Sequence, residues 1–261
     1  MITDAYTNEQ YHAHPAISSS DVKAAMKSLA HWKGAKRGTS AALEIGTAFH
    51  DLVLEGGQTV LCGPETRRGN VWKDAKAEAD AAGKTLLTEG EYYMVSEMAE
   101  SCLRQPRIHA LVRHPEAMIE QSIFVTCPET GLELKCRPDC YVKEKQVCLD
   151  LKSTVDAGPH RGEFEKQVFG LNYHVQGAYY AYVLKLAGLP VTYFAFAAVE
   201  KAPPYATCLH VLSGDVMEYA HDKMMNVLRR IKRAEDEGKY PTDWPELNMI
   251  HLPEWMKLQD E

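Results

Sequence analysis

The sequence predicts a mixed α/β domain in which a central mixed β-sheet is flanked by helices. Two observations lead to this prediction. Residues 120–154 adopt the two-residue apolar period of strands, and stretches with the 3.6-residue period of helices lie on both sides of them. No internal repeat, low-complexity tract or Pro/Gly/Ser linker divides the 261 residues. We therefore expect one domain over 1–261, with a helical segment at about 1–60.

Three stretches before the strands predict helices. Residues 17–34, ISSSDVKAAMKSLAHWKG, are expected to form one helix capped by Ser19 or Ser20. Residues 40–57, SAALEIGTAFHDLVLEGG, carry an apolar stripe and end in two glycines. The third helix begins at Thr88, where Thr88 and Glu91 have capping-box spacing, and extends to about residue 103.

Between these helices, residues 63–84 are polar and weakly patterned. We expect a mobile arm that becomes ordered on a ligand, with Arg67, Arg68 and Trp72 contacting an anionic partner. A solvated loop anchored by Trp72 is the alternative.

The strand region reads as a three-stranded meander followed by alternating helices and strands. The expected strands are QSIFVT (121–126), LELKCRPDCYV (132–142) and QVCLDLKST (146–154), joined by turns at 127–131 and 143–145. A long helix over 163–186, an apolar strand over 191–200 and a helix over 214–237 follow. This order predicts helices on the faces of a mixed sheet.

Composition limits the class of function. The net charge of −7 argues against a protein that coats nucleic acid by electrostatics alone, although an enzyme acting on nucleic acid remains compatible with it. Seven irregularly spaced cysteines are typical of reduced thiols in a reducing compartment. No leader pattern or membrane-spanning apolar run is present, so we expect a cytoplasmic protein without membrane contact.

The hairpin around residues 143–145 gathers acidic groups. A turn centred between Glu144 and Lys145 places Asp139 opposite Asp150, and strand alternation puts Asp150 and Lys152 on one face. Two like charges at such short range repel, so a divalent cation such as Mg²⁺ would compensate them. Lys152 would orient or deprotonate a water for phosphodiester hydrolysis. The alternative is a surface hairpin with one Lys152–Asp salt bridge.

Two helical motifs add candidates. Gln176 and Tyr180 are four residues apart and share a helix face, where they would contact a substrate strand or simply pack. His50 lies one turn after Gly46, a glycine that would allow close approach of another element. His50 could then donate a ring nitrogen to the metal, or be a structural core histidine.

The series GTAFH, RPD, DLK and QGAYY resembles the PD-(D/E)XK nuclease superfamily in its RecB-like subgroup. The flanking stretches 11–34, 68–78 and 83–93, together with HLPEW (251–255), are similar to RecE-type exonuclease VIII nuclease domains and their phage-encoded relatives. This resemblance implies a Mg²⁺-dependent exonuclease, with Mn²⁺ as a substitute. It would degrade linear double-stranded DNA from 5′ ends and leave 3′ single strands for a RecT-like annealing protein. It also implies a homo-oligomer, as in ring tetramers, in the cytoplasm of a bacterium or phage-infected host.

The resemblance also implies roles for individual residues. Asp139, Asp150, His50 and the Leu151 carbonyl would be metal ligands, and Lys152 would orient the water. Gln176 and Tyr180 would hold the catalytic architecture or a DNA strand, and we expect DNA contacts from Arg137, Arg67 and Arg68. Some RecB-like nucleases hold an iron-sulfur cluster with late cysteines. Only Cys208 follows the motifs here, so we expect no iron-sulfur cluster.

Two alternatives stay open at this point. An endonuclease of the same fold, either structure-selective or restriction-like, would use the same metal chemistry, because the motif does not decide how DNA enters. A nuclease-derived DNA-binding protein without activity is the other. Intact Asp139, Asp150 and Lys152 count against it, because a binding module gains nothing from crowded carboxylates beside a phosphate.

Overall fold

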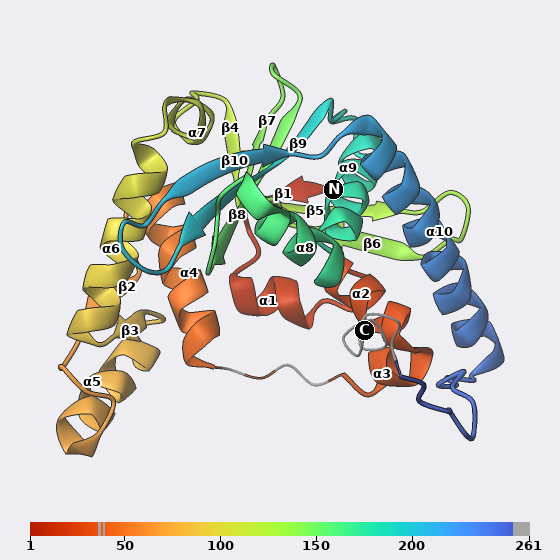
Figure 1. Ribbon diagram of the computed structural model, residues 1–261, viewed down its shortest axis with the longest axis horizontal. Coiled ribbons are helices and arrows are strands. Elements are labelled where there is room, and N and C mark those ends of the chain that lie inside the picture. Colours follow the sequence, from red (N-terminus) through yellow and green to blue (C-terminus); the bar gives the residue numbers. More distant parts are fainter. Residues whose placement is uncertain (36–37, 39, 253–261) are drawn as a thin grey trace, which may run out of the picture.

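A five-stranded mixed sheet forms the centre of the molecule (Figure 1). The computed structural model describes residues 1–252 except 36, 37 and 39. In spatial order the strands are β10 (Thr207–Val211), β9 (Tyr193–Glu200), β8 (Val147–Thr154), β7 (Cys140–Val142) and β4 (Ala117–Ile119). Strands β8 and β9 pair in parallel and their neighbours pair antiparallel, which confirms the predicted mixed sheet.

Two smaller sheets flank the central one. The first contains β1 (Ile2–Thr3), β5 (Ser122–Thr126) and β6 (Glu133–Cys136). The second is a parallel pair of β2 (Val60–Cys62) and β3 (Thr85–Leu87). The sequence analysis did not predict β1, β2, β3, β4 or β10, because each is short and carries little apolar alternation of its own.

Helices cover both faces of the central sheet (Figure 1). One face packs on α4 (Ala41–Leu54), α6 (Glu89–Leu103) and α7 (Pro106–Val112). The other packs on α2 (Ser19–Lys27), α9 (Tyr173–Leu186) and α10 (Gly214–Glu237). The remaining helices are α1 (Asn8–Ala13), α3 (Leu29–Lys33), α5 (Gly69–Ala81) and α8 (Glu163–Gly170).

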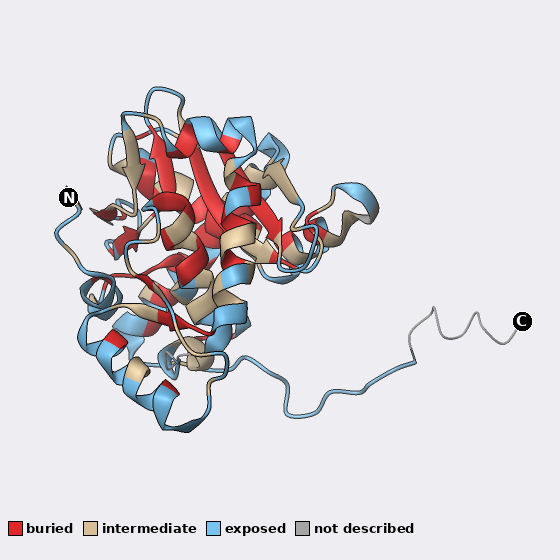
Figure 2. Cartoon of the chain, turned by 90° about the vertical axis from the view of Figure 1, so that its left-hand side faces the viewer, coloured by how far each residue is buried: buried red, intermediate tan, exposed pale blue. Residues whose placement is uncertain are grey.

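Strand β8 separates the two cores by simple alternation. Leu149 and Leu151 enter the core beneath α4 and α6, whereas Cys148 enters the core beneath α9. Asp150 and Lys152 point to that same α9 side, as the two-residue period requires. Figure 2 shows the strands as the most buried part of the chain. The polar groups of β8 are therefore held on a backbone that is anchored by leucines on its opposite face.

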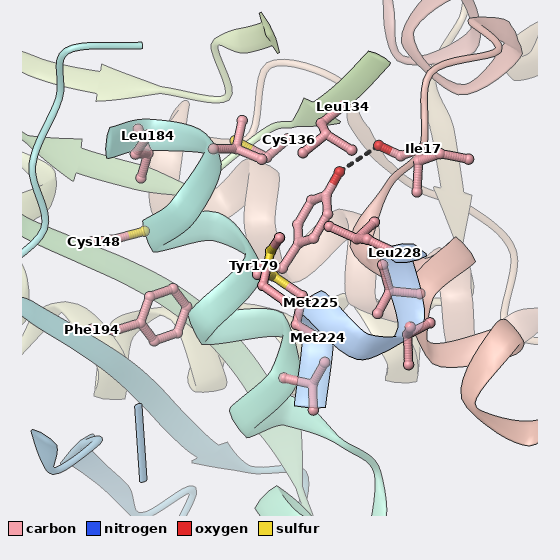
Figure 3. Packing of buried hydrophobic residues seen from close by; sticks show 14 of the residues in the cluster. Ile17, Leu134, Cys136, Cys148, Tyr179, Leu184, Phe194, Met224, Met225 and Leu228 are labelled. Atoms are coloured by element: carbon pink, nitrogen blue, oxygen red, sulfur yellow. Dashed lines mark hydrogen bonds between the residues drawn. The ribbon is translucent and has the colours of Figure 1, made fainter. Parts of the chain in front are cut away.

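Helix α9 ties the N-terminal segment to the sheet. The buried Tyr179 hydroxyl donates to the Ile17 carbonyl and, at 3.2 Å, to the Lys135 carbonyl (Figure 3). The Lys135 ammonium in turn donates to the Tyr11 carbonyl at 2.7 Å and the His14 carbonyl at 2.6 Å. These bonds hold the strand before the hairpin, the α1 segment and α9 in one unit.

Several predicted elements agree with the structure. The helices expected over 40–57, 88–103 and 214–237 are α4, α6 and α10, and Ser40 and Thr88 cap the first two. The strand over 191–200 is β9. Of HLPEW, residues 253–255 lie outside the described residues. No helix within the described part of the chain has the length and apolar character that a membrane crossing needs.

Two predicted helices are wrong in extent. The helix over 17–34 is interrupted at Ser28, which ends α2 and caps α3, and the cap of α2 is Ser18 rather than Ser19 or Ser20. Ser18 is the cap because its Oγ accepts a hydrogen bond from the Asp21 N–H, while the Asp21 carboxylate accepts one from the Ser18 N–H. The helix over 163–186 is divided at Asn172, whose φ of 55° is left-handed, into α8 and α9.

Two further predictions need correction. The strand expected over 132–142 is β6 and β7 in different sheets, because residues 137–139 leave the first sheet before the chain enters the second. The mobile arm expected over 63–84 contains the helix α5 instead. Trp72 and Ala79 are buried against the β2–β3 pair, and their spacing with Ala75 is helical.

The structure also corrects the expectation for Gly46. A Cβ placed there would meet no heavy atom of the described residues within 4 Å. Gly177 in α9 does permit close approach, because a Cβ there would lie 2.8 Å from Leu212 Cδ1 and 3.0 Å from Phe194 Cδ1.

We predict opposite effects for alanine at these two glycines. Gly177→Ala should lower the free energy of unfolding by about 1–2 kcal/mol, because crowding of Phe194 and Leu212 exceeds the gain in helix propensity. Gly46→Ala, the matched control, should raise it by up to about 1 kcal/mol. Urea melts of both variants measure this. Equal stabilisation by the two substitutions would contradict the packing of α9 on β9.

Candidate active site and metal centre

The acidic hairpin has the register that the sequence predicts. Cys140 pairs with Leu149, so Asp139 and Asp150 occupy the next opposed positions. Asp139 lies just before β7, and its Oδ2 accepts a hydrogen bond of 2.6 Å from the Leu151 N–H. Asp139 and Asp150 are 6% and 2% exposed, so both carboxylates are desolvated. Two carboxylates that are buried at opposed positions of a hairpin require compensating partners.

A cluster of three metal-ligand side chains lies on the Asp139 side. His50 of α4, Glu120 and Asp139 each offer a ligand atom, and these atoms all lie within 4.8 Å of one another. His50 Nδ1 is 3.5 Å from Asp139 Oδ1 and 3.8 Å from Glu120 Oε1. The side chains of His50 and Glu120 are about one-third exposed, at 30% and 31%, so the cluster is reachable from solvent.

Glu120 is the site residue that the sequence analysis missed. It follows β4 with a φ of 48°, and its N–H donates to the Asp139 carbonyl at 3.3 Å. The pairing of β4 with β7 carries it there, since Ile119 lies opposite Cys140. In the sequence, Glu120 was notable only because it precedes the strand expected at 121–126, which is β5. Its position in the structure is set instead by the short strand β4.

A second group lies on the Asp150 side. The Lys152 ammonium forms an ion pair with Asp150 Oδ2, and Gln176 Nε2 of α9 donates to Asp150 Oδ1 at 2.6 Å. Lys152 Nζ also lies 4.8 Å from the centroid of the Tyr173 ring. Within the described residues, Asp150 is therefore held by Lys152 and Gln176 rather than grouped with His50, Glu120 and Asp139.

The electrostatics of the site follow from burial and pairing. Burial alone would raise the pKa of Asp139, but His50 and Lys152 outweigh it and lower that pKa. Burial would lower the pKa of Lys152, but Asp150 and Asp139 raise it instead, so its amine stays an ammonium ion. Burial likewise opposes protonation of His50, yet Asp139 and Glu120 raise its pKa to about 10.

The donor set fits a divalent cation. Carboxylate oxygens are ligands for Mg²⁺ and Mn²⁺, and the imidazole nitrogen adds a donor of the kind that transition-metal ions accept. His50, Glu120 and Asp139 supply such a set, and Asp150 is the neighbouring carboxylate across the hairpin. In the protein without metal, the protonated His50 takes the position of the compensating cation. Metal and proton therefore compete for the same carboxylates.

Tyr180 and Leu151 are two further residues that were predicted for the site. Tyr180 follows Gln176 by one turn, and burial together with Tyr11 raises its pKa well above the ordinary value. Leu151 contributes its N–H to Asp139, while its side chain is buried in the core beneath α4 and α6. Tyr180 and Leu151 thus flank the carboxylates, and their proposed contacts remain predictions.

Two of the basic residues expected to contact DNA, Arg137 and Arg67, already have protein partners. The Arg137 guanidinium donates to Ser122 Oγ at 2.6 Å and to the Tyr6 carbonyl at 2.7 Å. Arg67 forms ion pairs with Glu44 and Glu91. A phosphate would have to replace these partners.

Arg68, the third basic residue expected to contact DNA, is exposed. Its contribution to DNA binding stays a prediction.

Comparison with known proteins identifies the family and the fold of the chain. Residues 18–252 match a family described as a PDDEXK-like domain of unknown function, DUF3799. The structure resembles that of a candidate exonuclease from Eubacterium rectale, with 15% identity, a TM-score of 0.62 and coverage of 98% of this chain and 99% of that one. A phage-related exonuclease from Haemophilus somnus 129PT matches at 12% identity and a TM-score of 0.40, over 87% and 98% of the two chains. No curated protein matches the chain.

We predict a pH-dependent stability contribution from His50 in metal-free protein. Its pKa is raised from 6.5 to about 10, so the contribution is fully present below about pH 6.5 and is lost as pH rises through about 10. The stability difference between wild type and His50→Gln should therefore shrink between about pH 6 and 10, measured by urea melts with chelator. Exposed His109→Gln is the control. A difference independent of pH would contradict the ion pairs with Asp139 and Glu120.

We also predict that Glu120→Gln weakens divalent-cation binding roughly tenfold or more, because the amide loses the ligand charge. The metal dependence of the melting temperature measures this. Glu116→Gln, which removes an exposed carboxylate just before β4, should bind the cation like wild type. If the two variants have equal metal midpoints, Glu120 is not a ligand.

Proposed function

The chain belongs to the DUF3799 family of PDDEXK-like domains, and from this premise we propose that this nuclease is a Mg²⁺-dependent exodeoxyribonuclease acting on linear double-stranded DNA. It degrades one strand from the 5′ end and leaves a 3′ single strand for recombination through an annealing partner. The observation that carries the proposal is the buried pair Asp139 and Asp150, with Lys152 and the His50–Glu120 cluster on its two sides.

The residues divide the chemistry between them. His50, Glu120 and Asp139, with Asp150 beside them, would hold Mg²⁺. When bound, that ion supplies Lewis acidity and charge neutralisation to the phosphodiester. Lys152 is an ammonium ion with a raised pKa, so its role is to donate a hydrogen bond to the attacking water rather than to remove its proton. It also offsets the negative charge that develops on the phosphoryl oxygens.

The polar contacts of the second group keep Lys152 in place. Asp150 pairs with the ammonium, and Gln176 donates to the other oxygen of Asp150. The Gln176 side chain is only 7% exposed, so its amide is fixed by packing of α9. Such preorganised groups stabilise a transition state without having to reorient during the reaction.

The proposed exonuclease differs from an endonuclease because it requires a DNA end and digests in one direction. The 5′ to 3′ polarity, the annealing partner and a ring-shaped oligomer rest on the resemblance to RecE-type domains. The metal chemistry rests on the geometry of the site. The two parts therefore need separate experiments.

We predict that Asp139→Asn, Asp150→Asn and Lys152→Met each reduce Mg²⁺-dependent hydrolysis by at least about 10²–10³-fold. Each removes a charge that the reaction requires, while the side-chain volume is nearly kept. Hydrolysis of labelled linear duplex measures the loss, and melting curves check the fold. Exposed Asp74→Asn and Lys73→Met on α5 are matched controls with full activity expected. Near-normal activity of any of the three site variants would refute its assigned role.

We predict that wild-type protein with Mg²⁺ digests linear duplex and leaves covalently closed circles intact, whereas chelator stops digestion. A label at the 5′ terminus should be released early, and a label at the 3′ terminus should remain on long single strands. Cleavage of the closed circle would instead favour an endonuclease. Early release of the 3′ label would reverse the proposed polarity while leaving the metal chemistry in place.

A further inference from the structure

Lys23 is a second lysine beside the catalytic hairpin, and neither the motifs nor the proposed mechanism uses it. It lies on α2, and its Nζ donates to Gln176 Oε1 at 3.3 Å. The same Gln176 donates through Nε2 to Asp150 at 2.6 Å. One buried amide thus links the Lys23 ammonium to the acidic pair.

Lys23 and Lys152 share an aromatic neighbour but differ in charge compensation. The Tyr173 ring centroid lies 5.7 Å from Lys23 Nζ and 4.8 Å from Lys152 Nζ. Lys152 has Asp150 as its ion-pair partner. Among the described residues, Lys23 has only the neutral Gln176 oxygen as a hydrogen-bond partner and belongs to no ion pair. A cation–π contact compensates such a charge only in part.

The surroundings of Lys23 disfavour the protonated form of its amine. Burial and the nearby Lys152 lower the pKa of Lys23 to about 8, although Asp150 acts in the opposite direction. A partly desolvated ammonium ion without a carboxylate partner is stabilised when an anion arrives. The position beside the hairpin indicates which anion would come within reach, since the substrate of this site carries one phosphate per nucleotide.

We propose that Lys23 binds a phosphate group of the DNA strand that the hairpin hydrolyses. This inference rests on the proposed function and adds a phosphate-binding position to the same site. Gln176 separates Lys23 from Asp150, so Lys23 holds a phosphate neighbouring the one under attack. A compact ammonium ion suits a phosphate oxygen as a point-charge partner. The phosphate is either the 5′-terminal group or an internal phosphodiester, two sources with the same chemistry.

Binding in Ca²⁺ tests the inference without requiring catalysis. We would measure the affinity of wild type, Lys23→Met, Lys23→Arg and Lys27→Met for a fluorescent linear duplex over a range of salt concentrations. Lys27 is the matched control, because it lies on the same helix one turn later and is exposed. Melting curves establish that each variant is folded, and Lys23→Gln replaces Lys23→Met if the latter is not.

We expect Lys23→Met to bind the duplex roughly tenfold more weakly, with a slope of log affinity against log salt reduced by about one. Lys23→Arg should retain most of the affinity, and Lys27→Met should behave like wild type. Comparing duplexes with 5′-phosphate and 5′-hydroxyl ends identifies the source. A loss confined to the phosphorylated end indicates the terminal phosphate, and an equal loss on both indicates an internal one.

Wild-type affinity and salt slope in Lys23→Met would overturn the inference. So would unchanged affinity with a reduced rate constant for hydrolysis, which would make Lys23 a positioning residue for Gln176. Failure of the proposed function looks different. Wild type would then bind duplex in Ca²⁺ but not hydrolyse it in Mg²⁺, and the binding comparison among the Lys23 and Lys27 variants would still decide the role of Lys23.

Discussion

The repulsion between carboxylates that are buried side by side is the constraint on which the site depends. Asp139 and Asp150 occupy opposed positions of one hairpin, and Glu120 lies next to Asp139. In a medium of low dielectric constant, such a group is stable only if each charge has partners. The structure supplies different partners to the two aspartates. Asp139 has the Leu151 N–H and His50, whereas Asp150 has Lys152 and Gln176.

The fold provides these partners from elements that are distant in sequence. Strand β8 is held by Leu149 and Leu151 in the core beneath α4 and α6, so its opposite face can carry polar groups without losing its anchor. Helix α4 brings His50, the β4–β7 pairing brings Glu120, and α9 brings Gln176. Each group is therefore attached to a helix or strand end with a packed core behind it, which is the arrangement that keeps catalytic geometry fixed.

Local charge at the site differs from the net charge of −7 of the whole chain. Arg137 and Arg67 are the basic residues that stand out in the sequence, but both already bind protein groups. Lys152 pairs with the buried Asp150, and Lys23 lies beside it through Gln176. In the proposed mechanism, these two ammonium groups would favour the approach of a phosphate once a divalent cation is bound. Placement of a few charges, rather than their sum, governs how an acidic protein attracts DNA.

The strand alternation, the register of the hairpin and the proximity of Asp139, Asp150 and Lys152 were predictable from local sequence patterns. These follow from the two-residue period and from one short turn, which act over only a few residues. Helices α4, α6 and α10 were predictable as well, because their apolar stripes are local. Breaks at Ser28 and Asn172 and the division of 132–142 between two sheets escaped prediction, since they depend on which element each segment packs against.

The complete candidate site depends on contacts between elements that are distant in the sequence. Glu120 reaches Asp139 through the three-residue strand β4, whose pattern is too short to recognise, and Lys23 reaches Gln176 through packing of α2 on α9. The tertiary structure also showed that Gly177, and not Gly46, allows close approach, because the distance between two elements is not encoded in either one alone. Local periodicity orders side chains along one element, whereas a site formed from five elements is specified by how their cores pack together.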